Sequence, residues 1–356
     1  MVEWKKLGEV CTFNRGRTIT AKDAIEGDIP VIAGGQTPSY YHNESNRTGE
    51  SITVAGSGAY AGFISYWNQP IFVSDAFTVD PTKTLKHKYL FHWLKNNQEK
   101  VIATQKGAGV PHVHGKDIAN FLIPIPSLSE QQRIMDILDT FTFSIENLKQ
   151  QIAQRRKQYE FYRDQLLDLE GKPGVEMKTL GEVGEICMCK RIMKEQTSNC
   201  GEIPFFKIGT FGGKADAFIS RDLFEEYKTK YSYPEKGEIL ISAAGTIGRS
   251  VIFNGEDAYF QDSNIVWVAN NEKIVTNKYL YYFYQIAEWK TDGGTIKRLY
   301  NYNLKNTTIS VPSLHEQRRI VTILDTFESS IRNLEAQLSQ REKQYEYYRN
   351  KLLTFV

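Results

Sequence analysis

The side chains best suited to chemistry gather in two polar, glycine-containing loops, residues 106–114 and 293–301, one in each half of the chain. Such loops offer lysine, arginine, histidine and asparagine, and these side chains suit phosphates and base edges. Glycine-flanked turns hold further donors of the same kind. Taken alone, each such side chain could equally be an ordinary surface residue. The pattern predicts contact with DNA through Arg15, Arg17, Ser57, Tyr60, Lys106, His112, His114, Lys190, Arg191, Thr246, Arg249, Lys297, Arg298 and Asn301.

Signals for catalysis are few. Residues 56–62, Gly-Ser-Gly-Ala-Tyr-Ala-Gly, faintly resemble a nucleotide-binding turn. The matching segment of the second half lacks the pattern, so we interpret them as a structural turn. The sequence has no phosphate-loop, zinc-protease, serine-hydrolase or methyltransferase motif. Asp75, Asp80 and Lys83 fit no dependable nuclease spacing, and we predict no catalytic residue.

Metal binding is weakly indicated at two places. His112 and His114 could form a pair of ligands, but no carboxylate or third histidine lies at useful spacing. Cys187, Cys189 and Cys200 would need a fourth ligand, and the nearest histidines are distant in sequence. We therefore predict no metal and no cofactor, and we interpret all four cysteines as free thiols.

Composition narrows the class of protein. The chain has 356 residues and 41% hydrophobic content, enough for two domains with real cores. Its 44 basic and 42 acidic residues nearly balance, which counts against a protein that coats nucleic acid without specificity. Neither a signal peptide nor an apolar run that could span a membrane is recognised, so we expect a cytoplasmic protein.

The chain is a tandem duplication. The motif Pro-Ser-Leu-x-Glu-Gln-x-Arg-Ile begins at Pro126 and again at Pro312, and 27 of 45 positions are identical between 125–169 and 311–355. Leu-Gly-Glu-Val opens both halves, at Leu7 and Leu180. The openings are closer together in sequence than the later motifs, so the stretch between opening and motif is longer in the second half. Two copies that share their flanking segments but differ in the stretch between them suit a protein with two different recognition surfaces.

A long helix is predicted after each repeated motif, with Ser127 or Ser129 as the first N-cap. Apolar residues recur at alternating steps of four and three over more than four heptads, which predicts a coiled-coil seam. The predicted seam positions, also expected to dock partners, are Ile134, Leu138, Phe141, Ile145, Leu148, Ile152, Arg155, Ile320, Leu324, Phe327, Ile331, Leu334, Leu338 and Arg341.

A short linker should make the two helices pair antiparallel, with similar domains at their ends related by an approximate twofold axis. Each helix of about 40 residues would be a rod of roughly 60 Å. Arg155 and Arg341 could form a buried polar pair that sets the register, or could lie at a solvated edge of the seam. The alternative is that each helix packs on its own domain or pairs with another chain.

The stretches before the helices are predicted to be mixed, strand-rich domains. Strands are expected at 51–54, 71–73, 238–241 and 265–268. The segment 73–75 parallels 260–262, which places Asp75 opposite Asp262. The predicted fold class is α+β, with two mixed α/β domains and two long helices in an antiparallel coiled coil. The expected boundaries are 1–126 and 177–312 for the domains, 127–170 and 313–356 for the helices, and 171–176 for the linker.

These features resemble the specificity subunit of type I restriction-modification enzymes. The resemblance covers nearly the whole chain and is most specific in the repeated motif, its long helix and the Leu-Gly-Glu-Val openings. In that family two target-recognition domains read the parts of a split DNA sequence, and the helices set the spacer between them. The chain is on the short side for the family, which leaves the length of the first half-site open.

The resemblance implies a non-catalytic subunit of a methyltransferase and endonuclease complex. Its partners would be double-stranded DNA, two methyltransferase subunits docked on the helices, and restriction subunits. S-adenosylmethionine and ATP would bind those partners. A rod of roughly 60 Å would span at most about 18 base pairs at 3.4 Å each. The alternative is a scaffold protein whose duplicated coiled coil assembles a complex without DNA.

Overall fold

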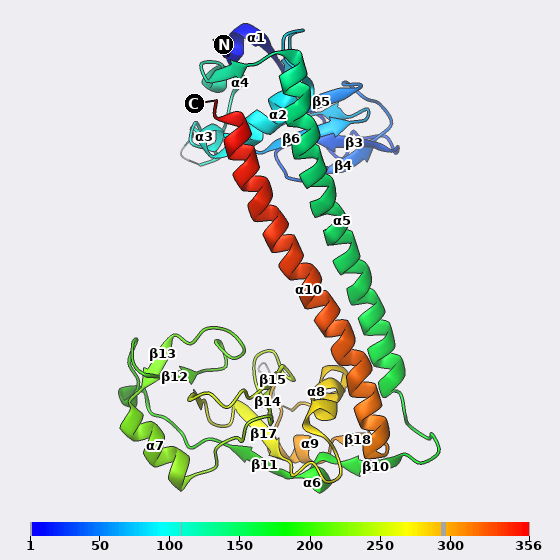
Figure 1. Ribbon diagram of the computed structural model, residues 1–356, viewed down its shortest axis with the longest axis vertical. Coiled ribbons are helices and arrows are strands. Elements are labelled where there is room, and N and C mark those ends of the chain that lie inside the picture. Colours follow the sequence, from blue (N-terminus) through cyan, green and yellow to red (C-terminus); the bar gives the residue numbers. More distant parts are fainter. Residues whose placement is uncertain (1, 108, 293–296, 356) are drawn as a thin grey trace. The chain divides into compact units, whose positions relative to one another are not determined.

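The computed structural model describes residues 2–107, 109–292 and 297–355. They divide into two compact units, Met1–Gln151 with Leu334–Val356, and Ile152–Asn333. Each unit contains one strand-rich domain and a segment of each of two 40-residue helices, α5 (Leu128–Leu167) and α10 (Leu314–Leu353) (Figure 1). The predicted class of mixed α/β domains with two long helices is confirmed.

The first domain contains a two-stranded, a four-stranded and a three-stranded sheet. In spatial order these are β1 (Glu3–Lys6) and β9 (Leu122–Ile125); β2 (Cys11–Arg15), β8 (Ala76–Pro81), β5 (Glu50–Ala55) and β6 (Ile64–Asn68); and β4 (Tyr40–His42), β3 (Ile29–Ile32) and β7 (Phe72–Val73). Its helices are α1 (Leu7–Val10), α2 (His87–Asn96), α3 (Gln98–Ile102) and α4 (Gly115–Ile118).

The second domain repeats these three sheets with the same strand order. They are β10 (Glu176–Thr179) and β18 (Thr308–Val311); β11 (Glu185–Met188), β17 (Ile265–Ala269), β14 (Ile239–Ser242) and β15 (Ser250–Ile252); and β13 (Ala217–Ile219), β12 (Ile203–Phe206) and β16 (Tyr259–Phe260). Its helices are α6 (Leu180–Val183), η1 (Lys194–Gln196), α7 (Arg221–Lys230), α8 (Asn277–Ile286) and α9 (Asn301–Lys305).

Alternating apolar residues place one face of each central sheet against a helix. Ile52 and Val54 of β5 are fully buried and share one apolar core with Tyr89 and Leu90 of α2. The second domain repeats this packing with β14 and α8. Burying an apolar side chain of this size stabilises the fold by about 1.5–3 kcal/mol. The shared frame is therefore maintained by the core, and the surface is free to differ.

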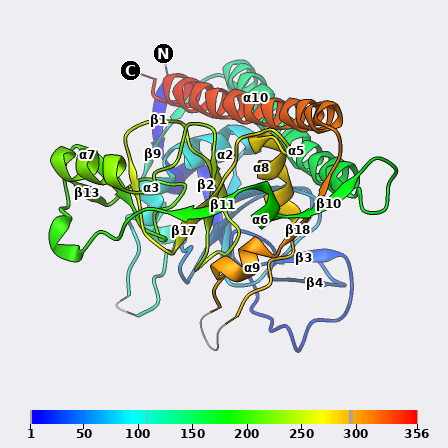
Figure 2. The same ribbon diagram turned by 90° about the horizontal axis from the view of Figure 1, so that it is seen from below.

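The extra residues of the second domain form a helix. Val31 pairs with Phe72 in the first domain, and Phe205 pairs with Tyr259 in the second, so the chain between the paired residues is longer in the second. Helix α7 lies in that interval, and Ser220 caps it by accepting a backbone N–H at 3.3 Å. Within the second unit, α7 and β13 lie far from α8 in both views (Figures 1 and 2).

Each long helix begins at a serine. Ser127 Oγ accepts the amide N–H of Glu130 at 3.2 Å, and Ser313 Oγ accepts that of Glu316 at 3.3 Å. Ser129 lies inside α5, so Ser127 is the N-cap of the two candidates. An N-cap of this type stabilises a helix by about 1 kcal/mol.

In the first unit, the early part of α5 packs antiparallel to the late part of α10. The ring of Phe141 stacks on that of Tyr348, with centroids 5.3 Å apart, and Lys149 pairs with Glu342 at 3.5 Å. Contacts thus move backward along α10 as they move forward along α5. Ile134, at the start of the seam, is fully buried in the domain core.

The second unit contains the corresponding pair. Tyr162 of α5 stacks on Phe327 of α10 at 5.4 Å, and the guanidinium of Arg155 lies 5.8 Å from the same ring. In the first unit, Arg341 lies 5.6 Å from the ring of Phe141. Both arginines are half-buried, so each acts as a cation over an aromatic ring at the edge of the seam.

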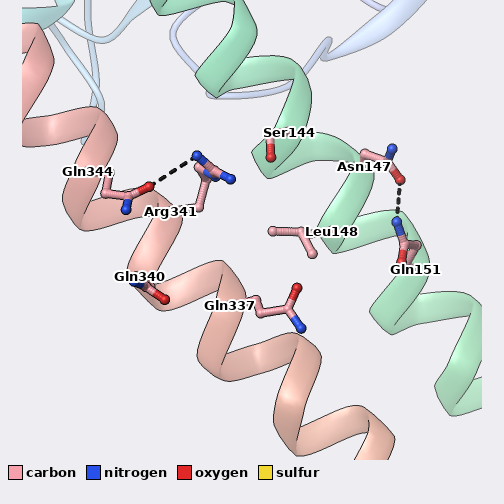
Figure 3. Close-up of a pocket in the computed structure, with 8 residues that line it drawn as sticks. All are labelled: Ser144, Asn147, Leu148, Gln151, Gln337, Gln340, Arg341 and Gln344. Carbon is pink, nitrogen blue, oxygen red and sulfur yellow. Dashed lines mark hydrogen bonds between the residues drawn. The ribbon is translucent and has the colours of Figure 1, made fainter.

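A polar groove of about 270 Å³ interrupts the seam in the first unit (Figure 3). Arg341 Nη1 donates to Gln344 Oε1 at 3.1 Å, and Gln151 Nε2 donates to Asn147 Oδ1 at 2.7 Å, each along its own helix. Leu148 is the apolar member of the lining. This section therefore adds little apolar burial to the pairing of the helices.

Candidate nucleic-acid interface

Loop 106–114, of which residue 108 lies outside the described part, closes on itself and on the end of strand β5. Lys106 and His112 exchange two backbone hydrogen bonds, with N···O distances of 2.9 and 2.8 Å. The amide of Val113 donates to the carbonyl of Gly56 at 3.0 Å, and the amide of Gly58 donates to the loop at 3.0 Å. Gly58 has a φ of +86°, which glycine adopts without strain. The backbone therefore fixes the loop against the glycine turn.

A groove of about 320 Å³ opens beside this loop. Its exposed lining residues are Arg15, His112, His114 and Lys116, whereas Phe77 is buried. The imidazole rings of His112 and His114 lie parallel, with centroids 6.2 Å apart. Exposed basic side chains around a concave surface attract an anionic backbone such as that of DNA.

Two carboxylates stand at the edges of this site, and each has a partner. The ammonium of Lys106 donates to Asp117, and this hydrogen bond and its charge lower the pKa of Asp117 below its usual value. The hydroxyl of Ser57 donates to Asp75, which lines the groove. The predicted residues Arg15, Ser57, Lys106, His112 and His114 are therefore brought together.

The second loop, described from Lys297 onward, uses the same backbone bonds; residues 293–296 lie outside the described part. Asp292 and Arg298 exchange backbone hydrogen bonds of 3.1 and 2.9 Å, and the amide of Leu299 donates to the carbonyl of Ala243 at 2.9 Å. These match the bonds of Lys106 with His112 and of Val113 with Gly56. Arg298 thus stands at the place of His112, at the same sequence offset as the repeated Pro-Ser-Leu motif.

The side chains of the second loop differ from those of the first. Arg298 Nη2 donates to Ser263 O at 3.0 Å, to Ser263 Oγ at 2.9 Å and to Asn264 Oδ1 at 2.9 Å. The carboxylate of Asp292 accepts from the Tyr302 hydroxyl and, at 2.8 Å, from Asn303 Nδ2. The predicted DNA contact Arg298 therefore already braces the turn at Ser263, whose φ is +52°.

The predicted alignment of Asp75 with Asp262 is wrong. The amide of Gly56 donates to the carbonyl of Asp75 at 3.2 Å, and the equivalent amide of Ala243 donates to the carbonyl of Asn264 at 2.7 Å. Asn264 therefore occupies the place of Asp75. The second domain has a short insertion before strand β17, and a shared Asp in the sequence concealed it.

Two further predicted residues of the first domain do not line the groove. The guanidinium of Arg17 lies 5.2 Å from the ring of Phe72 and 3.8 Å from the Glu44 carboxylate. Tyr60 is 50% exposed on the glycine turn. Both remain predictions as DNA contacts.

The other predicted residues of the second domain lie at its surface. Arg191 Nε donates to Asp262 at 2.9 Å, the ammonium of Lys190 lies 5.1 Å from the Tyr231 ring, and Arg249 Nη1 donates to a backbone carbonyl at 3.0 Å. Thr246, Lys297 and Asn301 are exposed.

Sequence reasoning missed two groove residues. Lys116 follows His114 by two positions and is exposed in the same groove, so its charge and spacing could have indicated it. Asp75 was considered for nuclease chemistry and not for binding. Its place in the groove depends on strand β8, which the local sequence does not reveal.

A buried glutamine ties each domain to its long helix, and this role was also missed. Gln131 is fully buried; its Oε1 accepts from the Lys86 amide at 2.9 Å and its Nε2 donates to two carbonyls at 2.9 and 3.0 Å. Gln317 makes the same three bonds in the second unit, each at 2.9 Å, starting with the Thr276 amide. The repeated Glu-Gln of the motif thus serves the junction between domain and helix.

An aspartate further along each long helix makes a second tie. Asp139 accepts from Lys88 Nζ at 2.6 Å and contacts His92 Nε2 at 3.1 Å. Partial burial raises the pKa of Asp139, but these two bonds outweigh it and hold the pKa below its usual value. Asp325 accepts from Lys278 and Tyr282 in the second unit, at 2.7 and 2.6 Å.

Other kinds of site find little support in the described residues. In residues 2–107, 109–292 and 297–355, no three histidine, cysteine, aspartate or glutamate side chains converge as metal ligands. The four cysteines are free, and burial raises the pKa of Cys11 and Cys189 to about 12. In the same part of the chain, no helix is both long and apolar enough to span a membrane.

Comparison with known proteins decides the family. The model of the type I restriction modification DNA specificity domain matches residues 1–155 and 173–342. This chain belongs to the family of type I specificity subunits. It is 44% identical to a type I restriction enzyme specificity subunit of Haemophilus influenzae, over 99% of this chain and 96% of that one. The EcoR124I/EcoR124II specificity subunit of Escherichia coli is 29% identical, over 99% and 94%.

A solved structure supports the fold. The specificity subunit of a type I system from M. genitalium matches with a TM-score of 0.69 at 18% identity, over 99% of this chain and 96% of that one. The chain is thus a DNA sequence-specificity subunit with two recognition domains. The alternative of a scaffold protein that does not bind DNA has no support from these matches.

Proposed function

We propose that each domain reads one half of a bipartite DNA sequence and that α5 and α10 set the length of the unread spacer. The observation that carries this proposal is the pair of equivalent loops. They share their backbone hydrogen bonds, but place His112 in one domain and Arg298 in the other. Two loops with the same backbone but different hydrogen-bond donors can read two different base sequences. The remaining predicted contact residues stay part of the proposal as further contacts of each domain with DNA.

We further propose that two methyltransferase subunits dock on equivalent aromatic patches of the long helices. Phe161 and Tyr162 are 62% and 42% exposed, and their counterparts in the second copy of the repeat, Tyr347 and Tyr348, are 58% and 40% exposed. Exposed aromatic residues are enriched in protein–protein interfaces. One pair lies in each unit, which would give each methyltransferase subunit the same docking surface.

In this proposal the chain itself performs no catalysis. S-adenosylmethionine and ATP would be bound by methyltransferase and restriction subunits, and the complex would act on double-stranded DNA in the cytoplasm. The chain would supply sequence recognition and geometry. The proposed segments are residues 1–126 and 177–312 for recognition, with 127–170 and 313–356 as spacer helices joined through 171–176.

The test is to co-express the chain with the methyltransferase of its own system and to map methylated bases by single-molecule sequencing. We expect a split motif with methylated adenines in both halves, lost when this chain alone is deleted. Replacing residues 1–120 with the first domain of another family member should change one half of the motif. A change in both halves, or an assembled complex that methylates no motif, would count against the proposal.

The role of α5 and α10 in setting the spacer can be tested by insertions at the polar groove between them. Inserting one heptad into both helices, within 144–150 of α5 and 338–344 of α10, adds about 10 Å, or about three base pairs. We expect unchanged half-sites separated by a longer spacer. An insertion in α5 alone should break the pairing of the helices and abolish methylation. An unchanged spacer after the matched insertion would refute this role.

A further inference from the structure

The carboxylate of Asp75 has an unusual position in the first domain. It lies in the groove beside loop 106–114 and accepts a hydrogen bond from Ser57. Within the described residues, no lysine, arginine or histidine forms an ion pair with it. An anionic group at a surface that otherwise presents Arg15 and Lys116 does not serve phosphate binding. The carboxylate of Asp75 is therefore available to a hydrogen-bond donor other than Ser57, and that donor is not a phosphate.

The second domain shows what this position accepts. Asn264 takes the place of Asp75, and its Oδ1 accepts from the guanidinium of Arg298 at 2.9 Å. The second domain thus fills the position with a planar nitrogen donor from its own chain. In the first domain His112 stands where Arg298 stands, and no hydrogen bond joins it to Asp75 among the described residues. The carboxylate of Asp75 is a stronger acceptor than the amide of Asn264, and it has no guanidinium donor like that of Arg298.

The space left open suits a donor from outside the chain. The groove measures about 320 Å³, and the side chains of Phe13 and Phe77 give it an apolar lining. The exposed His112 and His114 border it. A carboxylate only accepts hydrogen bonds. In the major groove it therefore favours the amino group of adenine or cytosine and disfavours the carbonyl and ring-nitrogen acceptors of guanine and the carbonyl of thymine.

We propose that Asp75 reads the exocyclic amino group of an adenine or a cytosine in the DNA half-site of the first domain. This assignment rests on the proposed function. The rim residues Arg15 and Lys116 hold the neighbouring phosphates, and Ser57 fixes the orientation of the carboxylate. In the second domain the guanidinium of Arg298 occupies the same place, so that domain reads no amino group there.

The experiment uses the full chain in complex with its methyltransferase partners, on a duplex that carries the motif found by methylation mapping. Each adenine of the first half-site is replaced in turn by purine, and each cytosine by 2-pyrimidinone, which removes the amino group. We expect the wild-type complex to bind about fivefold more weakly, or worse, at one of these positions. The two analogues distinguish adenine from cytosine.

The variants then assign that effect to Asp75. In Asp75→Ala, which removes the acceptor, removal of the same amino group should cost less than twofold. His112→Arg should behave likewise, because it offers Asp75 a guanidinium as in the second domain. Asp80→Asn is the matched control: Asp80 lies on β8, which begins directly after Asp75, is bonded to Asn14 and Thr78, and does not line the groove. It should keep the wild-type pattern.

The outcomes separate the two levels of the proposal. A wild-type complex without sequence-specific binding would overturn the proposed function itself. Specific binding that is insensitive to loss of the amino group at every adenine and cytosine of the first half-site would overturn the role of Asp75 alone. The same holds if Asp75→Ala and His112→Arg remain as sensitive as the wild type.

Discussion

The two recognition domains share the backbone hydrogen bonds of one pair of loops but differ in the side chains that those loops carry. Loop 106–114 and its counterpart at 297–301 make equivalent bonds to the ends of β5 and β14. Yet His112 of the first loop leaves a groove open, whereas Arg298 of the second fills the equivalent place by binding Ser263 and Asn264. Backbone bonds and core packing thus maintain the geometry, and side chains can change without loss of the fold.

The junctions between domain and helix show the opposite behaviour. Gln131 and Gln317 make the same three hydrogen bonds, and Asp139 and Asp325 both bind a lysine of the neighbouring helix. A change at a junction would tilt the domain on its helix, and with it the recognition surface. In the proposed function, the junctions that set the geometry are the same in both halves, and the loops that read bases differ.

The largest effect should come from the buried glutamines. Gln131→Ala and Gln317→Ala each leave one buried amide and two carbonyls without a partner, and we expect each to lower the free energy of unfolding by about 2–4 kcal/mol. Chemical denaturation of the full chain measures this. Because the junctions are equivalent, the two losses should agree within about 1 kcal/mol.

Gln150→Ala is the matched control for the glutamine variants. Gln150 is exposed on α5 and bonds Glu146 at 3.4 Å within the same helix, so its removal should cost less than about 0.5 kcal/mol. Glutamine variants no more destabilising than this control would contradict the role of the junction.

The loops should respond unequally to loss of their central side chain. Arg298→Ala removes three hydrogen bonds that brace the turn at Ser263, so we expect a loss of about 1–3 kcal/mol in stability. His112→Ala removes an exposed ring and should change stability by less than about 0.5 kcal/mol. Thermal unfolding of both variants measures the two losses. Equal shifts in Tm would contradict the inference that Arg298 supports its loop and His112 does not.

Features set by local periodicity were predictable from the sequence. The two long helices, the N-cap at Ser127 or Ser129 and the strand around Ile52 follow from spacing within a short window. The duplication follows from the match between the two halves of the chain. The antiparallel pairing within each unit followed from the position of the linker. The alternation of apolar residues likewise placed β14 and β17 close to their observed bounds.

The remaining features depend on which backbone atoms meet in three dimensions. Asp75 aligns with Asp262 in sequence, but the hydrogen bond to its carbonyl aligns it with Asn264. The sequence shows Gln131 and Gln317 as repeated polar residues, and their burial depends on the distant amides of Lys86 and Thr276. The charge of Arg298 indicated a DNA contact. Its hydrogen-bond acceptors, Ser263 and Asn264, lie in the turn before β17, and the local sequence does not show that they are close.

The seam should again show equality between the units. Phe141 and Phe327 are half-buried, each stacks on a tyrosine of the opposite helix, and each lies under an arginine. We expect Phe141→Ala and Phe327→Ala to destabilise by about 1–2 kcal/mol each, below the range for fully buried aromatic residues. Phe161→Ala, which removes an exposed ring, is the control. A large difference between the two seam variants would show that the seams are not equivalent.

The smallest effect concerns the aspartate of the first junction and depends on pH. The folded state lowers the pKa of Asp139, so its contribution is present above the ordinary pKa of aspartate, about 3.9, and is lost as the pH falls through the folded value. The side chain is 34% exposed, so we expect Asp139→Asn to lose at most about 1 kcal/mol at pH 7. That difference from the wild type should shrink below about pH 4. If the difference for Asp139→Asn stayed constant in denaturation between pH 7 and pH 3, the bonds to Lys88 and His92 would stabilise the junction by packing and not by charge.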